Sequence, residues 1–232
     1  APAASAALPQ VHPERSQVID LPPRLSTLIG RDDARDTLVS WLDDPDDRLI
    51  ALTGPGGVGK TRLALDVAYA ATSRFTRIQF VSLAAVTERR AVLPAIARAL
   101  GVTAGEPEEI LAHIRELLLA APTLLILDTF EQVIDAAPDI AALLEQNPQL
   151  WTLVTSRTAL RLPRERVFEV DVLAGPHDVP STADEALAWP AVQLFVDRVH
   201  RFDPAFTLDA QTAPAVVAIC RRLDGLPLGI EL

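Results

Sequence analysis

The sequence feature that most constrains the fold is the glycine-rich segment 54–61, which reads GPGGVGKT. It matches the pattern GxxxxGK[ST], and it lies between a short apolar segment, 48–53, and a segment with apolar residues at helical spacing, 60–71. Glycines let the backbone wrap around phosphate groups, so that successive N–H groups and the N-terminus of the next helix face negative charge. The pattern therefore predicts a strand, a phosphate-binding loop (P-loop) and a helix, in that order.

The same segment supplies side chains that can hold a nucleotide and its metal ion. Lys60 is the only lysine in the chain, and its compact ammonium is expected to neutralise the β and γ phosphate oxygens. The hydroxyl of Thr61 is placed to bind Mg²⁺. We expect the nucleotide to contact the loop and the first turn of the helix through Gly54, Gly56, Gly57, Val58, Gly59, Lys60, Thr61 and Arg62.

Three later residues follow predicted strands. Asp128 ends the apolar run 123–127, where its carboxylate can bind Mg²⁺ opposite Thr61, although an Asp in this position can equally start a turn. Arg157 can reach a γ-phosphate from its strand end, or it can be a surface arginine. Glu131 can position the attacking water, or it can be a charge in the first turn of a helix. The catalytic candidates are therefore Asp128, Glu131 and Arg157, and the metal-ligand candidates are Thr61 and Asp128.

Strand and helix patterns alternate along most of the chain, which indicates a parallel sheet covered by helices on both faces. We predict an α/β fold of the P-loop NTPase type with a parallel five-stranded sheet, its strands at 48–53, 78–83, 123–127, 150–155 and 167–172. The helices between them are predicted at 32–42, 60–71, 91–100, 107–119 and 133–144, the last interrupted near Pro138.

The predicted organisation has three parts. Residues 1–18 have no periodicity and are expected to be a linker or tail, and residues 19–175 form the predicted nucleotide-binding domain. Only helical patterns follow, at 190–200 and 213–223, so that residues 176–232 are predicted to be a small helical domain. The chain ends within the apolar segment 226–232, without a helix cap or a polar C-terminal segment, and we therefore expect that this domain is truncated.

Composition restricts the partners and the location. A formal net charge of −10 argues against nucleic acid binding by this segment, because contacts with a polyanion require a basic surface. No apolar run approaches the roughly 18 to 20 residues that cross a bilayer, and no signal-peptide pattern is present. We therefore expect a cytoplasmic protein that does not bind a membrane. The single cysteine, Cys220, is predicted to be a small buried apolar residue.

Five short motifs occur in the order seen in NB-ARC-like STAND ATPases, namely Leu28-Ile29-Gly30-Arg31, GPGGVGKTRLAL, LLILDTFEQV, LVTSR and Gly225-Leu226-Pro227-Leu228. The sequence resembles most the bacterial branch whose members often carry a LuxR-type DNA-binding domain and helical repeats. This resemblance implies a nucleotide held between the nucleotide-binding and helical domains. It places Ile29 and Arg31 beside the adenine, Pro227 over it, and Arg157 as the sensor of the γ-phosphate.

The resemblance also implies a function. A protein of this kind binds ATP or ADP with Mg²⁺ and serves as the switch of a signalling or transcription-regulatory protein, with slow hydrolysis at most. Its partners would be the adenine nucleotide, further domains of its own chain and, in the ATP state, other copies. The chain departs from the family pattern at Thr129, where many members have a second acid after the strand, so that a hydrolytic base is not assured. A winged-helix domain with a nucleotide-sensing His would follow beyond Leu232.

Two other functions compete with the switch. One is a P-loop ATPase whose main task is catalysis, as in an AAA-type motor or a P-loop kinase, although no acceptor pocket or clear catalytic acid is evident in the sequence. The other is a scaffold that keeps ADP permanently as a structural cofactor. A GTPase is disfavoured, because the guanine-reading NKxD motif requires a second lysine.

Overall fold

The computed structural model describes residues 17–24, 26–102, 107–176 and 182–232. Its centre is a six-stranded sheet in which all neighbouring strands are parallel, with the strand order β1-β3-β4-β5-β2-β6. The strands are β1 (Val18–Asp20), β2 (Leu49–Thr53), β3 (Arg77–Ser82), β4 (Thr123–Asp128), β5 (Leu150–Thr155) and β6 (Glu165–Glu169). The parallel α/β class predicted from the sequence is confirmed.

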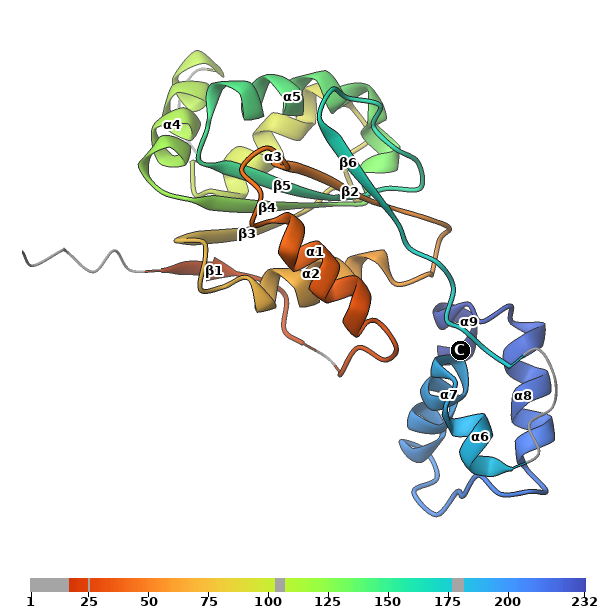
Figure 1. Ribbon diagram of the computed structural model, residues 1–232. Coiled ribbons are helices and arrows are strands. Elements are labelled where there is room, and N and C mark those ends of the chain that lie inside the picture. Colours follow the sequence, from red (N-terminus) through yellow and green to blue (C-terminus); the bar gives the residue numbers. More distant parts are fainter. Residues whose placement is uncertain (1–16, 25, 103–106, 177–181) are drawn as a thin grey trace, which may run out of the picture.

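Helices cover both faces of the sheet (Figure 1). One face carries α1 (Asp32–Trp41) and α2 (Lys60–Ala70), and the other carries α3 (Val92–Ala99), α4 (Pro107–Ala120) and α5 (Ala137–Gln146). Side chains of the central strand β4 alternate between the two cores: Leu124 and Ile126 pack with α1 and α2, while Leu125 and Leu127 pack on the opposite face. Because both faces are covered, every residue of β4 is buried, which explains its run of apolar residues.

A third apolar core lies beside the sheet. It is formed by α6 (Ala183–Leu187), α7 (Pro190–His200), α8 (Ala213–Arg222) and α9 (Pro227–Glu231), which lie together at the C-terminal end of the chain (Figure 1). Cys220 is 1% exposed in this core, as predicted, and burial raises the pKa of its thiol to about 11. Ile29, from the segment before α1, also packs against this core. None of the helices that the structure describes is long and apolar enough to cross a membrane.

The prediction of five strands was wrong by one, because it missed β1. Val18 belongs to this strand and not to the predicted tail 1–18. The strand pairs with β3 at the edge of the sheet, where the Val18 N–H donates to Thr76 O (2.9 Å) and Gln79 Nε2 donates to Asp20 Oδ2 (2.5 Å). All three residues of β1 are exposed, so the strand has no apolar pattern that marks it in the sequence.

Strand β6 begins and ends earlier than the predicted 167–172. The N–H of Val170 still donates to Thr53 O (2.8 Å), but β2 ends at Thr53, so that the chain beyond has no strand to pair with. Instead it turns toward the C-terminal helices, and the N–H of Leu173 donates to Gly225 O (2.9 Å). Tertiary contacts, which the sequence pattern does not contain, therefore determine where this strand stops.

The predicted helix 133–144 consists of two elements. A 3₁₀ segment, η2 (Phe130–Ala136), precedes α5 and is kinked at Val133, whose φ and ψ are −130° and 39°. Pro138 lies in the first turn of α5, where a missing N–H needs no partner, so that it starts the helix and does not interrupt it. A short 3₁₀ segment, η1 (Arg89–Ala91), leads into α3 in the same way. Helices α6 and α9 were not predicted, because five residues are too few to show helical periodicity.

Candidate functional site

The P-loop connects β2 to α2 in a conformation that favours glycine, and at two of its positive-φ glycines there is also no room for a Cβ. Gly54 has a φ of +142°, and a Cβ there would lie 2.7 Å from the carbonyl oxygen of Val170. Gly57 has a φ of +79°, and its Cβ would lie 2.7 Å from the Cβ of Leu228. No side chain of the described residues caps α2, whose N-cap is Gly59. The first N–H groups of the helix are therefore available to an anion.

The ammonium of Lys60 is folded back onto this loop. Its Nζ donates hydrogen bonds to the carbonyl oxygens of Gly54 (2.8 Å) and Pro55 (2.9 Å), and the residue is only 9% exposed. Burial lowers the pKa of Lys60, and the positive charge of Arg157 also lowers it, while the carboxylates of Glu131 and Asp128 raise it. Both acceptors of this buried ammonium are neutral carbonyl groups. A phosphate group is charged and accepts hydrogen bonds more strongly, so it would be a better partner for Lys60.

Asp128 is the centre of a hydrogen-bond network at the carboxyl end of the sheet. It is 7% exposed, and its Oδ1 accepts from the hydroxyls of Thr61 (2.5 Å) and Thr155 (2.7 Å), while its Oδ2 accepts from the hydroxyl of Thr129 (3.1 Å). The Thr155 hydroxyl also accepts from the N–H of Thr129 (3.0 Å). The structure thus brings together Thr61 and Asp128, and their hydroxyl and carboxylate oxygens are the kind of ligand that Mg²⁺ prefers.

Glu131 and Arg157 form an ion pair beside this network. Arg157 Nε lies 3.3 Å from Glu131 Oε1, and Arg157 Nη2 would lie 3.9 Å from a Cβ on Gly56 of the P-loop. The side chain of Arg157 is 68% exposed, whereas that of Glu131 is 21% exposed. The second carboxylate oxygen, Glu131 Oε2, is buried without a hydrogen-bond partner among the described residues. A buried acceptor of this kind needs a donor, which a water molecule in the adjoining cavity would supply.

A cavity of about 280 Å³ lies beside these groups, and Lys60, Thr61 and Glu131 are among the residues that line it. The P-loop forms one side of it, and Thr129, Glu131 and Thr155 form another. Its third side belongs to α9, whose residue Leu228 donates its N–H to Gly57 O (3.1 Å). The phosphate-binding loop is therefore in direct contact with the C-terminal helices.

The residues expected around an adenine surround a second, smaller cavity. Ile29, Arg31 and Pro227 line it together with Val58 and Arg62. Its volume is about 30 Å³, which is room for about two water molecules, so that a base fits only if the walls move apart. Arg31 Nη2 donates to the carbonyl oxygen of Asp171, and burial lowers the pKa of Arg31 although the charge of Asp171 opposes this.

Most of the predicted residues line one of two cavities, which share Gly59, Arg62 and Pro227, whereas Gly54, Asp128 and Arg157 line neither. The residues fit a nucleotide and a divalent ion: glycines that leave room for phosphates, a buried ammonium, and the oxygens of Thr61 and Asp128. Sequence reasoning missed the parts played by Thr155, Leu228 and Glu231. Thr155 has a signal, because it ends β5, the neighbour of β4. Leu228 follows Pro227 in a motif that the resemblance places at the nucleotide, whereas Glu231 has no signal, because only tertiary packing brings it to Arg62.

Comparison with known proteins agrees with this geometry. A family profile described as an AAA domain matches residues 44–162. "Putative HTH-type transcriptional regulator Rv0890c" of Mycobacterium tuberculosis H37Rv is 39% identical over 185 residues, which cover 79% of this chain and 20% of that protein. The chain therefore spans about a fifth of the length of this relative.

Two solved structures show the same fold at low sequence identity. One is a STAND protein with a tetratricopeptide repeat sensor, PH0952, from Pyrococcus horikoshii, with a TM-score of 0.56 and 14% identity, covering 93% of this chain and 30% of that one. The other is Drosophila ORC bound to DNA, with a TM-score of 0.60 and 13% identity, covering 87% of this chain and 58% of that one. The match of the family profile, together with the P-loop and the acid that ends β4, shows that this chain belongs to the AAA domain family of P-loop ATPases.

Proposed function

We propose that this chain is the ATP- and ADP-binding switch module of a STAND-type signalling or transcription-regulatory protein. We place it among the NB-ARC-like members, in the bacterial branch that often carries a LuxR-type DNA-binding domain. The observation that carries this proposal is the contact of α9 with the P-loop, in which the Leu228 N–H donates to Gly57 O (3.1 Å). Because Pro227, Leu228 and Glu231 also line the phosphate cavity, a bound nucleotide would touch the C-terminal helices directly. Changes at the phosphates can then alter the position of these helices.

The proposed division of the chain supports a switch of this kind. The nucleotide-binding domain would span residues 18–175, since Val18 belongs to β1, and the helical domain residues 176–232. Their junction would lie next to Leu173, whose N–H donates to Gly225 O (2.9 Å). The name of the mycobacterial relative and the STAND neighbour support a regulatory protein with further domains. Those domains would be the partners of this module, together with other copies in the ATP state.

The nucleotide would be held by the P-loop residues, with Thr61 and Asp128 as the ligands of Mg²⁺. The metal ion, when bound, would neutralise charge on the phosphate oxygens. Ile29, Arg31 and Pro227 would border the adenine, since all three line the smaller cavity. Arg157 would sense the γ-phosphate from its position beside the P-loop.

Hydrolysis would be slow at most. Glu131 is the nearest candidate for positioning a water molecule, but one of its oxygens is paired with Arg157 at 3.3 Å. Thr129, which stands where many family members have a second acid, hydrogen-bonds Asp128 instead. A water molecule held by the buried Oε2 of Glu131 would allow some hydrolysis, but the pairing of Glu131 with Arg157 fits the slow reset of a switch better than rapid turnover.

Two rival functions make different predictions about exchange. An ATPase whose main task is catalysis would turn over ATP many times, and a scaffold would keep ADP without exchange.

We propose a cytoplasmic protein in which this segment binds no nucleic acid, based on its net charge of −10, although a structural neighbour, Drosophila ORC, is bound to DNA.

The test begins with the nucleotide that co-purifies with the 232-residue chain, identified by ion exchange after denaturation. Labelled ATP and ADP are then exchanged into the protein, and phosphate release is followed in the same sample. A switch exchanges both nucleotides and releases phosphate slowly. Permanent retention of ADP would support the scaffold, and fast repeated turnover would support the catalytic ATPase.

A further inference from the structure

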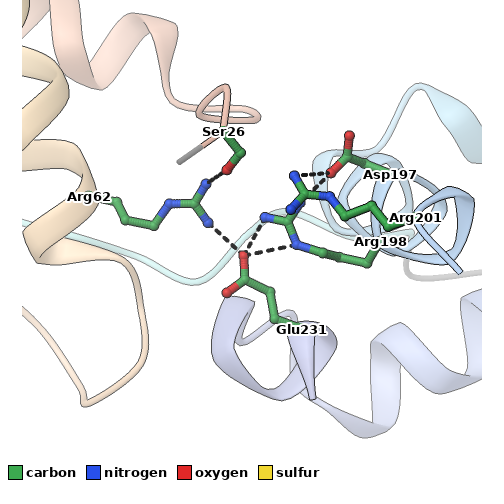
Figure 2. Close-up of polar contacts among 6 residues, drawn as sticks. All are labelled: Ser26, Arg62, Asp197, Arg198, Arg201 and Glu231. Atoms are coloured by element: carbon green, nitrogen blue, oxygen red, sulfur yellow. Dashed lines mark hydrogen bonds and ion pairs between the residues drawn. The ribbon is translucent and has the colours of Figure 1, made fainter. Parts of the chain in front are cut away.

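A single carboxylate joins three helices from both parts of the chain (Figure 2). Oε1 of Glu231, in α9, accepts hydrogen bonds from Arg62 Nη1 (2.6 Å), Arg198 Nη2 (2.6 Å) and Arg198 Nε (3.2 Å). Arg62 lies in the first turn of α2, directly after the P-loop, and Arg198 lies in α7. We call these three residues the Glu231 clasp.

The clasp is partly shielded from water and held in place by further contacts. The side chains of Glu231, Arg62 and Arg198 are 26%, 35% and 13% exposed. Arg62 also donates to the hydroxyl of Ser26, and Arg198 also donates to Asp197 (Figure 2). Burial opposes ionisation of Glu231, but the hydrogen bonds and charges of the two arginines outweigh it and lower its pKa. Partial burial and fixed orientation make such a pair stronger than a pair on the open surface.

The position of the clasp relates it to both cavities. Arg62 lines the phosphate cavity and the smaller cavity, and Glu231 lines the phosphate cavity. One turn before Glu231, Leu228 bonds to Gly57 of the P-loop. Helix α9 therefore cannot leave the P-loop unless the ion pair between Arg62 and Glu231 breaks. Because the smaller cavity has room for only about two water molecules, a base enters or leaves only after such a separation.

We propose that Glu231 is a positioning residue that clasps α7 and α9 onto the P-loop helix and thereby sets the rates at which nucleotide enters and leaves. This inference rests on the proposed function, namely nucleotide binding at this site. If the protein must open before a nucleotide can enter and before it can leave, both rate constants are proportional to the fraction of open molecules. Weakening the clasp raises that fraction.

The test compares Glu231→Gln with the wild-type 232-residue chain, using the fluorescent probe N-methylanthraniloyl-ADP in stopped-flow measurements. Glutamine preserves the shape and removes the charge. We expect the association and dissociation rate constants both to rise about tenfold, which corresponds to the loss of one charge-assisted hydrogen bond, with little change in Kd. Arg198→Gln removes only the contact between α7 and α9 and keeps the ion pair of Arg62 with Glu231, so that both rate constants should rise by less than in Glu231→Gln.

Asp197→Asn is the matched control. It also removes a negative charge from a partner of Arg198, but Asp197 pairs only with Arg198 of α7 and with Arg201, the C-cap residue of that helix, among the ion pairs of the described residues. We expect both rate constants to stay within about twofold of wild type, because contacts inside α7 do not join the two parts.

Four results would overturn the clasp. Faster association with slower dissociation would mean that Glu231 acts only by repelling the phosphates. A lower melting temperature with unchanged rate constants would mean that it only braces the fold. Unchanged rate constants in both variants, with wild-type protein that binds the probe, would refute the clasp alone. A wild-type chain that binds no probe would refute the proposed function as well.

Discussion

Replacing Arg157 with alanine tests whether this guanidinium distinguishes ATP from ADP. Its side chain lies beside the P-loop, where Nη2 would be 3.9 Å from a Cβ on Gly56, and its nearest partner is Glu131 at 3.3 Å. A residue that meets only the γ-phosphate contributes to ATP binding and nothing to ADP binding. We therefore expect weaker ATP binding and nearly unchanged ADP binding.

The magnitude follows from the exposure of Arg157. A charge-assisted hydrogen bond contributes about 1.5 to 3 kcal/mol when it is shielded. Because 68% of the Arg157 side chain is exposed, water screens the interaction, and we expect about 1 to 1.5 kcal/mol, a five- to tenfold loss. Loss of Arg157 also leaves Glu131 without its cation, which repels a γ-phosphate further. The effect of Arg157 on the pKa of Lys60 acts on both nucleotides and cancels in their ratio.

Calorimetric titration with ADP and a non-hydrolysable ATP analogue, on protein stripped of nucleotide, measures this ratio. Arg90→Ala is a matched control, because Arg90 is an exposed arginine of η1 that pairs with Glu88 at 2.6 Å and not with Glu131. It should change neither affinity. Equal losses of ADP and ATP binding in Arg157→Ala would refute the sensor, because a residue that braces the P-loop affects both nucleotides.

Four further outcomes are expected. Lys60→Ala should abolish tight nucleotide binding in titrations, because it removes the chain's only ammonium; wild-type affinity would contradict the site. Adenine nucleotides should displace a bound probe and guanine nucleotides should not, so that GTP competing as well as ATP would contradict the adenine pocket. Thr155→Val should lower the free energy of unfolding in urea by about 1 to 3 kcal/mol, because the Thr129 N–H loses its acceptor and Asp128 loses a donor; an unchanged midpoint would show that the network adds nothing. Duplex DNA should show no salt-sensitive mobility shift with this segment, as its net charge of −10 implies.

The local parts of the fold were predictable because their signals lie in consecutive residues. The P-loop combines a buried strand, glycines with left-handed backbone and a helix within residues 49–70, and its pattern is sufficient to place it. The run of buried residues in β4 likewise marks a central strand of a parallel sheet. Parallel strands align their carboxyl ends at one edge, so that an acid at the end of β4 was expected to lie near the helix that begins at Lys60.

Other parts were not predictable, because they depend on contacts between residues far apart in the chain. Strand β1 is an exposed edge strand that exists through its pairing with β3, and it has no apolar pattern of its own. The site has the same limitation, since Arg62 and Glu231 are 169 positions apart and neither belongs to a pattern that names the other. By itself the sequence determined the P-loop, the acid that ends β4 and the parallel sheet, because backbone conformation and burial period are local properties. Only the tertiary structure decided that Leu228 bonds to the P-loop and that one carboxylate joins both parts, because packing of the third core sets the position of α9.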